Sequence, residues 1–292
     1  MKKKRFVLVS AVLLLLSLAT VSALATPFKP ILDEFWVVKD SNEIFRDSFD
    51  NSVPPPSGPD GTGTYSMHGA GGITGETGGK LTMTPSLGEP VVITTTYADL
   101  ATSGMRMLST DNTNPNFLGF DSSFEINGLF DMSNIPMITG QSFGIRASDR
   151  ALGLGNEGNN TFYLFVGVHS ITDEVGVFLR VHDFTTNSSV VLWSSPIASL
   201  LSVADQIELI LSKDAGSNML NASYFLYDIA DVTRGSGSKN NAGAIYDGED
   251  YIRAQFVSTD RVPIPEPATM LLFGTGLAGV AGLVRRRKKN QA

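Results

Sequence analysis

The fold class is decided by residues Thr161–Val168, which read TFYLFVGV. Phe162, Leu164, Val166 and Val168 stand at alternate positions, so an extended chain places all four on one face. This period of two is typical of a β-strand that has one buried face and one face in water.

The same alternation recurs along the chain. Val175–His182 and Gln206–Ser212 repeat it, and turn-rich pieces such as Asn156–Asn160 and Arg234–Ser238 separate the runs. A short helix is expected at Ile197–Asp205 alone. Further strands are expected at Glu43–Phe49, Lys80–Thr84, Val91–Tyr97, Ser122–Ile126, Phe143–Arg146, Val190–Trp193, Met219–Tyr227 and Tyr251–Val257. Many short strands with almost no helix predict an all-β fold, an antiparallel sandwich or barrel.

The N-terminus has the pattern of a secretory signal peptide over residues 1–25. Met1–Arg5 is basic, Phe6–Ala19 is almost wholly apolar, and small residues follow, so cleavage by signal peptidase after Ala23 or Ala25 fits equally well. An N-terminal membrane anchor is the alternative, and the short apolar run argues against it.

Residues 26–262 are expected to form one sandwich domain, with residues 26–42 as a candidate short N-terminal piece. The segment Val53–Gly61 contains four prolines, which remove ladder donors and exclude a central strand. We expect a long surface loop there, after a first strand at Glu43–Phe49. A linker between the N-terminal piece and the main domain is the alternative.

The charge of the central region narrows the function classes. Residues 26–262 hold 13 basic and 28 acidic residues, a net charge of −15. So acidic a domain repels phosphate backbones, which disfavours nucleic-acid binding. The chain has no cysteine, which excludes disulfides, thiolate zinc sites, iron–sulfur clusters and a cysteine nucleophile.

The C-terminus is a three-part tail over residues 263–292. It begins with a rigid Pro-Glu-Pro sequence, residues 265–267, and continues with an uncharged run over residues 268–284. As a helix that run would span about 25 Å, the short end of a membrane crossing. A cluster of basic residues then stays cytoplasmic. This cluster consists of Arg285, Arg286, Arg287, Lys288 and Lys289.

The whole tail resembles the PEP-CTERM sorting signal, with Pro265, Glu266 and Pro267 matching the recognition motif. The resemblance implies recognition by exosortase, a membrane protease of Gram-negative bacteria that make extracellular polysaccharide. It also implies cleavage near the motif and transfer of the body to the cell surface or extracellular matrix. A plain single-span anchor is the alternative reading.

The order of strands resembles the concanavalin/laminin-G-like jelly roll. Ile44–Asp50 is similar to the first strand of such domains and Gly78–Met83 to the second, while Gln206–Asp214 and Ala222–Tyr227 resemble the late hairpin. The resemblance implies an antiparallel jelly-roll sandwich. Members of that superfamily often bind carbohydrates, and some hydrolyse them.

Catalytic signatures are weak throughout the sequence. A retaining glycosidase needs two carboxylates about 5 Å apart, and jelly-roll members place them on one strand. Glu125, Asp173-Glu174 and Glu249-Asp250 do not form such a string, so we expect no enzyme activity. The histidines His68, His169 and His182 lack zinc-site spacing, although the last two could face each other across a hairpin.

No cofactor is expected, and calcium is the one ion with candidate ligands. Oxygen-rich loops at Asp111–Asn114 and Asn156–Asn160 could supply them, but neither follows an EF-hand spacing. Aromatic side chains could form a stacking platform for sugars, although a place in the core is the commoner role. The candidates are Trp36, Trp193, Tyr65, Tyr97 and Tyr163.

Together these observations predict a non-catalytic exported protein at the cell surface or in the exopolysaccharide or biofilm matrix. A lectin-like carbohydrate-binding module and a polysaccharide hydrolase or lyase are the alternatives. The expected partners are signal peptidase, exosortase, the membrane before processing, and extracellular polysaccharide.

Overall fold

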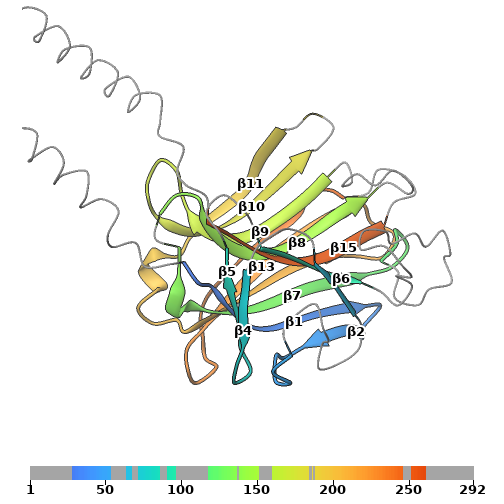
Figure 1. Cartoon of the computed structure of the whole chain (residues 1–292). Coiled ribbons are helices and arrows are strands. Elements are labelled where there is room, and N and C mark those ends of the chain that lie inside the picture. The colour runs from blue at the N-terminus through green and yellow to red at the C-terminus, as the bar shows by residue number, and fades with distance from the viewer. Residues whose placement is uncertain are drawn as a thin grey trace, which may run out of the picture.

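For the described residues, the computed structural model confirms an all-β fold built from two antiparallel sheets (Figure 1). It describes residues 28–53, 64–67, 72–85, 91–96, 118–136, 138–150, 160–183, 186, 188–245 and 251–260. The strands are β1 (Ile31–Lys39), β2 (Asn42–Asp47), β3 (Thr64–Met67), β4 (Gly72–Glu76), β5 (Leu81–Thr84), β6 (Val91–Thr96), β7 (Phe124–Asp131), β8 (Gln141–Arg150), β9 (Asn160–Val168), β10 (Val175–Asp183), β11 (Ser188–Pro196), β12 (Gln206–Lys213), β13 (Met219–Tyr227), β14 (Thr233–Ala244) and β15 (Tyr251–Asp260).

The two sheets have different strand orders. Sheet A has eight strands in the order β14-β13-β12-β7-β1-β5-β4, with β2 also paired to β1. Sheet B has seven strands in the order β11-β10-β9-β8-β15-β6-β3. Every strand pair in the described residues is antiparallel, as the alternating sequence predicts.

Aromatic side chains join the two sheets in the core. Phe35 of sheet A meets Phe256 of sheet B edge-to-face, with ring centroids 5.1 Å apart. Phe130 of sheet A meets Phe143 of sheet B at 4.8 Å. All four side chains are fully or almost fully buried, so these pairs add favourable ring geometry to the burial of large apolar surfaces.

A buried cation closes one end of this core. The ammonium of Lys213, the last residue of β12, donates to the carbonyl oxygens of Phe120 at 2.7 Å, Asp214 at 2.9 Å and Ser217 at 3.2 Å. Burial lowers the pKa of Lys213, and nearby acids, first Asp121, oppose that shift. The three carbonyl contacts offset the cost of removing the ammonium from water.

Strand β1 is a central strand that the sequence pattern did not predict. It pairs with β7 along its length, with β2 over Phe35–Lys39, and with β5 at Ile31 and Leu32. The register against β7 shifts between Leu32 and Glu34, and this irregularity breaks the period of two. Ile31–Lys39 is therefore part of sheet A.

Two local predictions are wrong. Ile197–Asp205 forms no α-helix, because the segment has only a 3-10 turn at Ala198–Leu200, followed by a turn at residues 201–203. Arg234–Ser238 is not a loop, because it lies inside edge strand β14. Gly235 and Gly237 suit that edge, since an added Cβ would come within 2.5 Å of Leu200 Cδ1 and 2.6 Å of Tyr224 Cε1, respectively.

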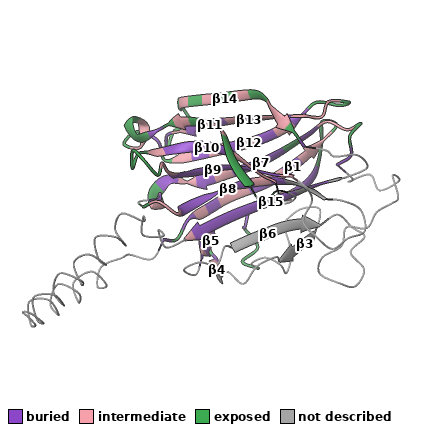
Figure 2. Ribbon diagram, turned by 90° about the horizontal axis from the view of Figure 1, so that it is seen from above, coloured by how far each residue is buried: buried purple, intermediate pink, exposed green. Residues whose placement is uncertain are grey.

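Burial follows this arrangement of sheets. Figure 2 shows buried residues along β15 and β9, whereas exposed residues are frequent on β14 and on the turns. The expected signal peptide (residues 1–25) and the tail (residues 263–292) lie outside the described residues. Within the described part of the chain, no helix is long and apolar enough to cross a membrane.

Candidate functional site

The outer face of sheet B carries an aromatic cluster instead of the polar side chains expected there. On β9 the residues that alternate with the core positions are Tyr163 and Phe165. Their neighbours across the ladder are Arg146 on β8 and Arg180 on β10 for Tyr163, and Phe178 on β10 for Phe165. The adjacent strands therefore bring three aromatic rings and two guanidinium groups onto one face.

The rings form a continuous stack. Tyr163 and Phe165 are stacked with centroids 4.4 Å apart, and Phe165 and Phe178 follow at 5.5 Å. The His169 ring extends the stack, 5.9 Å from Phe178. Such offset stacking holds each ring in place through its neighbour.

The two arginines lie over the faces of these rings. The Arg146 guanidinium is 5.0 Å from the Tyr163 centroid, and the Arg180 guanidinium is 5.6 Å from Tyr163 and 5.5 Å from Phe165. These distances are within the range of cation–π attraction. Each planar guanidinium also presents hydrogen-bond donors in a fixed fork, which suits carboxylates and hydroxyl groups.

Hydroxyl groups fix the Tyr163 end of the stack. The Tyr163 hydroxyl lies 3.1 Å from Ser142 Oγ, which lies 2.7 Å from Thr259 Oγ1, and either atom of each pair can be the donor. The three residues belong to β9, β8 and β15. The phenol is thereby tied to the neighbouring strand β8 and, through Ser142, to β15 on the far side of β8.

Glycines provide the room that the Phe rings occupy. A Cβ added to Gly167 would lie 2.8 Å from the Phe165 ring, and one added to Gly176 would lie 3.2 Å from the Phe178 ring. Gly167 and Gly176 face each other across the β9–β10 ladder. The Phe165 and Phe178 rings therefore lie over this pair of glycines, where no other side chain occupies the space.

Exposure differs between the parts of the cluster. Tyr163 is 2% exposed and Phe178 is buried, whereas Phe165, Arg146 and Arg180 are partly exposed. We call these five residues the aromatic–arginine cluster. Phe165, Arg146 and Arg180 are its partly exposed members, and the Tyr163 and Phe178 rings stack on either side of Phe165.

Among the sequence candidates whose side chains the structure describes, Tyr163 alone belongs to this cluster. Trp36 lies on sheet A, with the Arg46 guanidinium 5.5 Å from its ring, and Trp193 packs against Tyr224 at 5.9 Å. The Tyr65 side chain and Tyr97 lie outside the described residues. Sequence reasoning missed Phe165 because it assigned that face to water, although two aromatics at alternate positions were a usable signal.

The histidines do not face each other, so that hypothesis is wrong. His182 lies opposite Thr161 on the β9–β10 ladder, and its Nδ1 is 2.8 Å from Ser189 Oγ. His169 lies in the turn at the other end of the hairpin, where its Nδ1 accepts from the backbone amides of Ile171 and Thr172, both at 3.3 Å.

The remaining sequence candidates are scattered. Glu125 of β7 lies opposite Ser212 of β12, and Asp173 and Glu174 lie in the β9–β10 turn. Among the described residues no group of three or more His, Cys, Asp or Glu side chains could hold a metal ion. His68, Asp111–Asn114, residues 156–159 and Glu249-Asp250 lie outside those residues.

Comparisons with known proteins bear on the tail more than on the sandwich. No curated protein matches the chain. Among solved structures, the chain is similar to the CBM2 module of an evolved Dit protein from Lactobacillus casei BL23 phage J-1, with 10% identity over 78% of this chain and 89% of that one. The TM-score of 0.28 is too low to support an argument about fold or ligand.

A match to a family model identifies the sorting tail, and this match does not involve the sandwich. Residues 263–288 match the family described as the PEP-CTERM protein-sorting motif. They include Pro265, Glu266 and Pro267 and most of the basic cluster. The chain therefore carries a PEP-CTERM sorting motif, which implies an exported protein whose membrane-anchored precursor is processed by exosortase.

Proposed function

We propose that this chain is a surface or extracellular-matrix protein of a Gram-negative bacterium, whose non-catalytic jelly-roll sandwich binds exopolysaccharide. The observation that carries the proposal is the aromatic–arginine cluster on the outer face of sheet B. The sorting motif supports the location, since it implies export. A role in biofilm follows if the bound polymer belongs to the matrix.

The chemistry of the cluster favours a sugar ligand that carries carboxylates. A partly exposed ring such as Phe165 offers an apolar face for the C–H groups of a pyranose. Arg146 and Arg180, partly exposed beside it, carry the planar guanidinium group that pairs well with carboxylate oxygens. The two arginines also provide local positive charge on an otherwise acidic domain, so acidic polysaccharides are the preferred class.

A polysaccharide hydrolase or lyase is the second candidate function. The strongest carboxylate candidates from sequence that the structure describes are Glu125 on sheet A and the Asp173-Glu174 turn of sheet B. They belong to different sheets and do not form the pair of facing carboxylates that retaining glycosidases use. The cluster itself has no acidic residue, which supports binding without cleavage.

Binding is tested with the full-length chain in detergent, applied to immobilised neutral and uronate-containing polysaccharides. We expect saturable retention on the acidic polymers, and a loss of affinity of about fivefold for Phe165→Ala, since one aromatic contact contributes about 1 kcal/mol. Phe225→Ala is the matched control, because Phe225 is a partly exposed ring on the outer face of sheet A.

Equal binding by the two variants would overturn the assignment to this face. An absence of saturable retention on every polymer would overturn the binding function and leave a purely structural matrix role. Release of reducing ends or of unsaturated sugars from the polymers would replace binding by hydrolase or lyase activity, respectively.

A further inference from the structure

One end of the sandwich carries exposed aliphatic side chains on several separate turns. Ile171 lies in the β9–β10 turn and is 85% exposed, and Ile229 lies in the β13–β14 turn and is 91% exposed. Val232 in the same turn, Val203 between β11 and β12, and Ile138 before β8 are also exposed. We call these five residues the aliphatic end.

Hydrogen bonds show that these turns belong to the same end. The Ile229 amide donates to Asp205 Oδ2 at 2.8 Å, which joins the β13–β14 turn to the segment after Val203. The Met132 amide, on the way from β7 to β8, donates to the carbonyl of Asp205 at 2.8 Å. On sheet B, the Ile197 amide donates to the carbonyl of Val175, next to the β9–β10 turn.

The chain leaves the sandwich toward its sorting tail at this end. Asp260, the last residue of β15, pairs with Gln141, whose amide donates to the carbonyl of Ile138. The sorting motif begins at residue 263, and three residues of chain span at most about 11 Å. The aliphatic end is therefore next to the start of the segment that anchors the precursor.

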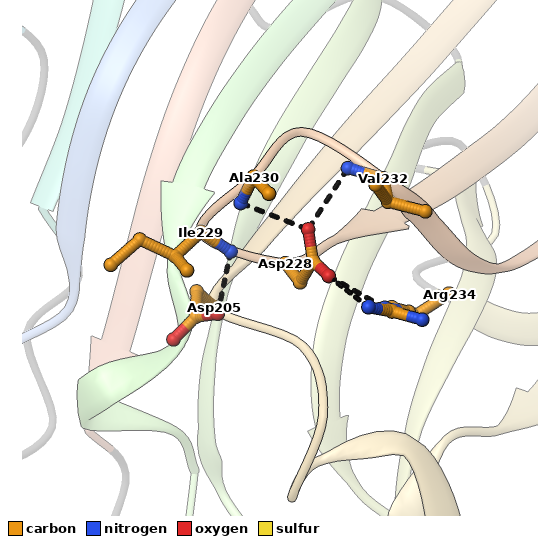
Figure 3. Close-up of polar contacts among 6 residues, drawn as sticks. All are labelled: Asp205, Asp228, Ile229, Ala230, Val232 and Arg234. Carbon is orange, nitrogen blue, oxygen red and sulfur yellow. Dashed lines mark hydrogen bonds and ion pairs between the residues drawn. The ribbon is translucent and has the colours of Figure 1, made fainter.

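The turn that presents Ile229 is firmly built (Figure 3). Asp228 accepts from the backbone amides of Ala230 and Val232, both at 2.9 Å, and from Arg234 Nε at 2.7 Å. The Arg234 Nη2 atom also donates to the same carboxylate. In Figure 3 the Ile229 side chain points away from this network. An apolar side chain held outward in this way is available for contact without further ordering cost.

We propose that in the membrane-anchored precursor this aliphatic end lies against the surface of a lipid bilayer, with Ile171 and Ile229 inserted among the headgroups. The inference rests on the anchored precursor that the sorting motif implies, and it is independent of polysaccharide binding. Exposed apolar groups gain free energy when they leave water for the interface. The tail supplies a high effective concentration, so individually weak contacts suffice.

The charges of the aliphatic end indicate the headgroup class. Asp173 and Glu174 follow Ile171 in the same turn, and Asp231 lies between Ile229 and Val232. Negative side chains beside the inserted residues are repelled by anionic lipids. The surface therefore fits zwitterionic headgroups better than anionic ones.

The absence of cysteine from the chain makes a direct test simple. The full-length chain with Ile229→Cys, labelled with an environment-sensitive fluorophore, is reconstituted through its tail into phosphatidylcholine vesicles. Lipids with a spin label at a shallow acyl position then quench any label that enters the interface. Val190→Cys is the matched control, because Val190 is an exposed aliphatic residue on β11. It lies six residues, or about 20 Å along the strand, from Pro196, which is the residue of β11 at the aliphatic end.

We expect at least twofold stronger quenching at residue 229 than at residue 190, and weaker quenching at 229 when half of the lipid is anionic. An Ile171→Cys label, on the opposite sheet, should behave like the label at 229. Equal quenching at 229 and 190 would overturn the proposal, with circular dichroism verifying that both labelled chains are folded. Protection of residue 229 only after co-reconstitution with exosortase would also overturn it, in favour of a protein partner. Stronger quenching in anionic vesicles would overturn the headgroup preference.

Discussion

At the scale of single residues, Asp228 shows how one carboxylate organises a turn. The chain leaves β13 at Tyr227 and must reverse within five residues before β14 begins. Asp231 takes a positive φ of 57° in this turn, a conformation that aspartate tolerates better than most residues. The Asp228 side chain binds the amides that the reversal leaves without ladder partners.

Asp228→Asn should make the folded state less stable at neutral pH and remove part of its acid sensitivity. The Val232 amide, followed by Arg234 and the Ala230 amide, holds the pKa of Asp228 below its ordinary value of 3.8, although burial opposes this shift. A lowered folded-state pKa stabilises the protein above the unfolded-state pKa, and that stabilisation is lost as pH falls through the folded-state value. Urea denaturation of both chains at pH 7 and near pH 3 measures the difference.

The matched control for this experiment is Asp231→Asn in the same turn. The side chain of Asp228 accepts the turn hydrogen bonds, whereas Asp231 contributes its backbone amide to the carbonyl of Asp228 at 2.9 Å. We expect the stability difference between the Asp228→Asn and parent chains to narrow toward pH 3, and the Asp231→Asn chain to follow the parent. A difference that stays constant across this range would contradict a contribution from the Asp228 charge.

At the scale of elements, the sequence pattern predicted strands well where they have one regular register. Met219–Tyr227 is predicted to the residue, and buried and partly exposed positions alternate without interruption along β13. Strand β1 was not predicted, because a register shift disrupts its alternation, and β14 was not predicted, because its glycines are typical of a loop. Neither neighbour that explains these glycines, Leu200 or Tyr224, is close to them in sequence.

The contact between β8 and β9 gives a sharp test of packing within sheet B. A Cβ on Gly144 would lie 2.1 Å from the carbonyl oxygen of Leu164 and 2.6 Å from the Cα of Phe165, so the backbone of β9 would have to move. We expect Gly144→Ala to cost at least about 3 kcal/mol of unfolding free energy, at the upper end for overpacking. Urea denaturation followed by circular dichroism measures this cost.

Gly176→Ala serves as the comparison for that substitution. Its added Cβ would lie 3.0 Å from the carbonyl oxygen of Ser195 and 3.2 Å from the Phe178 ring, a milder approach than at Gly144. The loss of stability should therefore be clearly smaller. An equal or larger loss for Gly176→Ala would show that crowding of the β9 backbone does not limit sheet B.

At the scale of the whole molecule, the sorting motif could be predicted from the sequence, whereas the aromatic–arginine cluster could not. The sorting motif is a contiguous string, so its residues were predictable without a structure. The aromatic–arginine cluster combines residues from three strands, and only pairing across β8, β9 and β10 brings them together. Tyr163 was a sequence candidate, but its arginine neighbours on β8 and β10 required the register.

Processing of the tail provides the prediction that tests the molecule as an exported precursor. Replacing Pro265, Glu266 and Pro267 by alanine should leave the precursor uncleaved in the membrane, because the recognition sequence is removed while the apolar run and the basic cluster remain. Immunoblotting of membrane and extracellular fractions, with the intact mass of the product, measures processing in cells that contain exosortase.

Asn290→Ala is the control for that experiment, since residue 290 lies outside the matched segment 263–288. It should be processed like the parent chain. Normal cleavage of the alanine-substituted motif would refute recognition through Pro265–Pro267 and leave the tail as a plain anchor. If the motif variant and Asn290→Ala both stay uncleaved in the membrane, processing is sensitive to any change in the tail. Loss of processing in the motif variant alone therefore places recognition at these three residues.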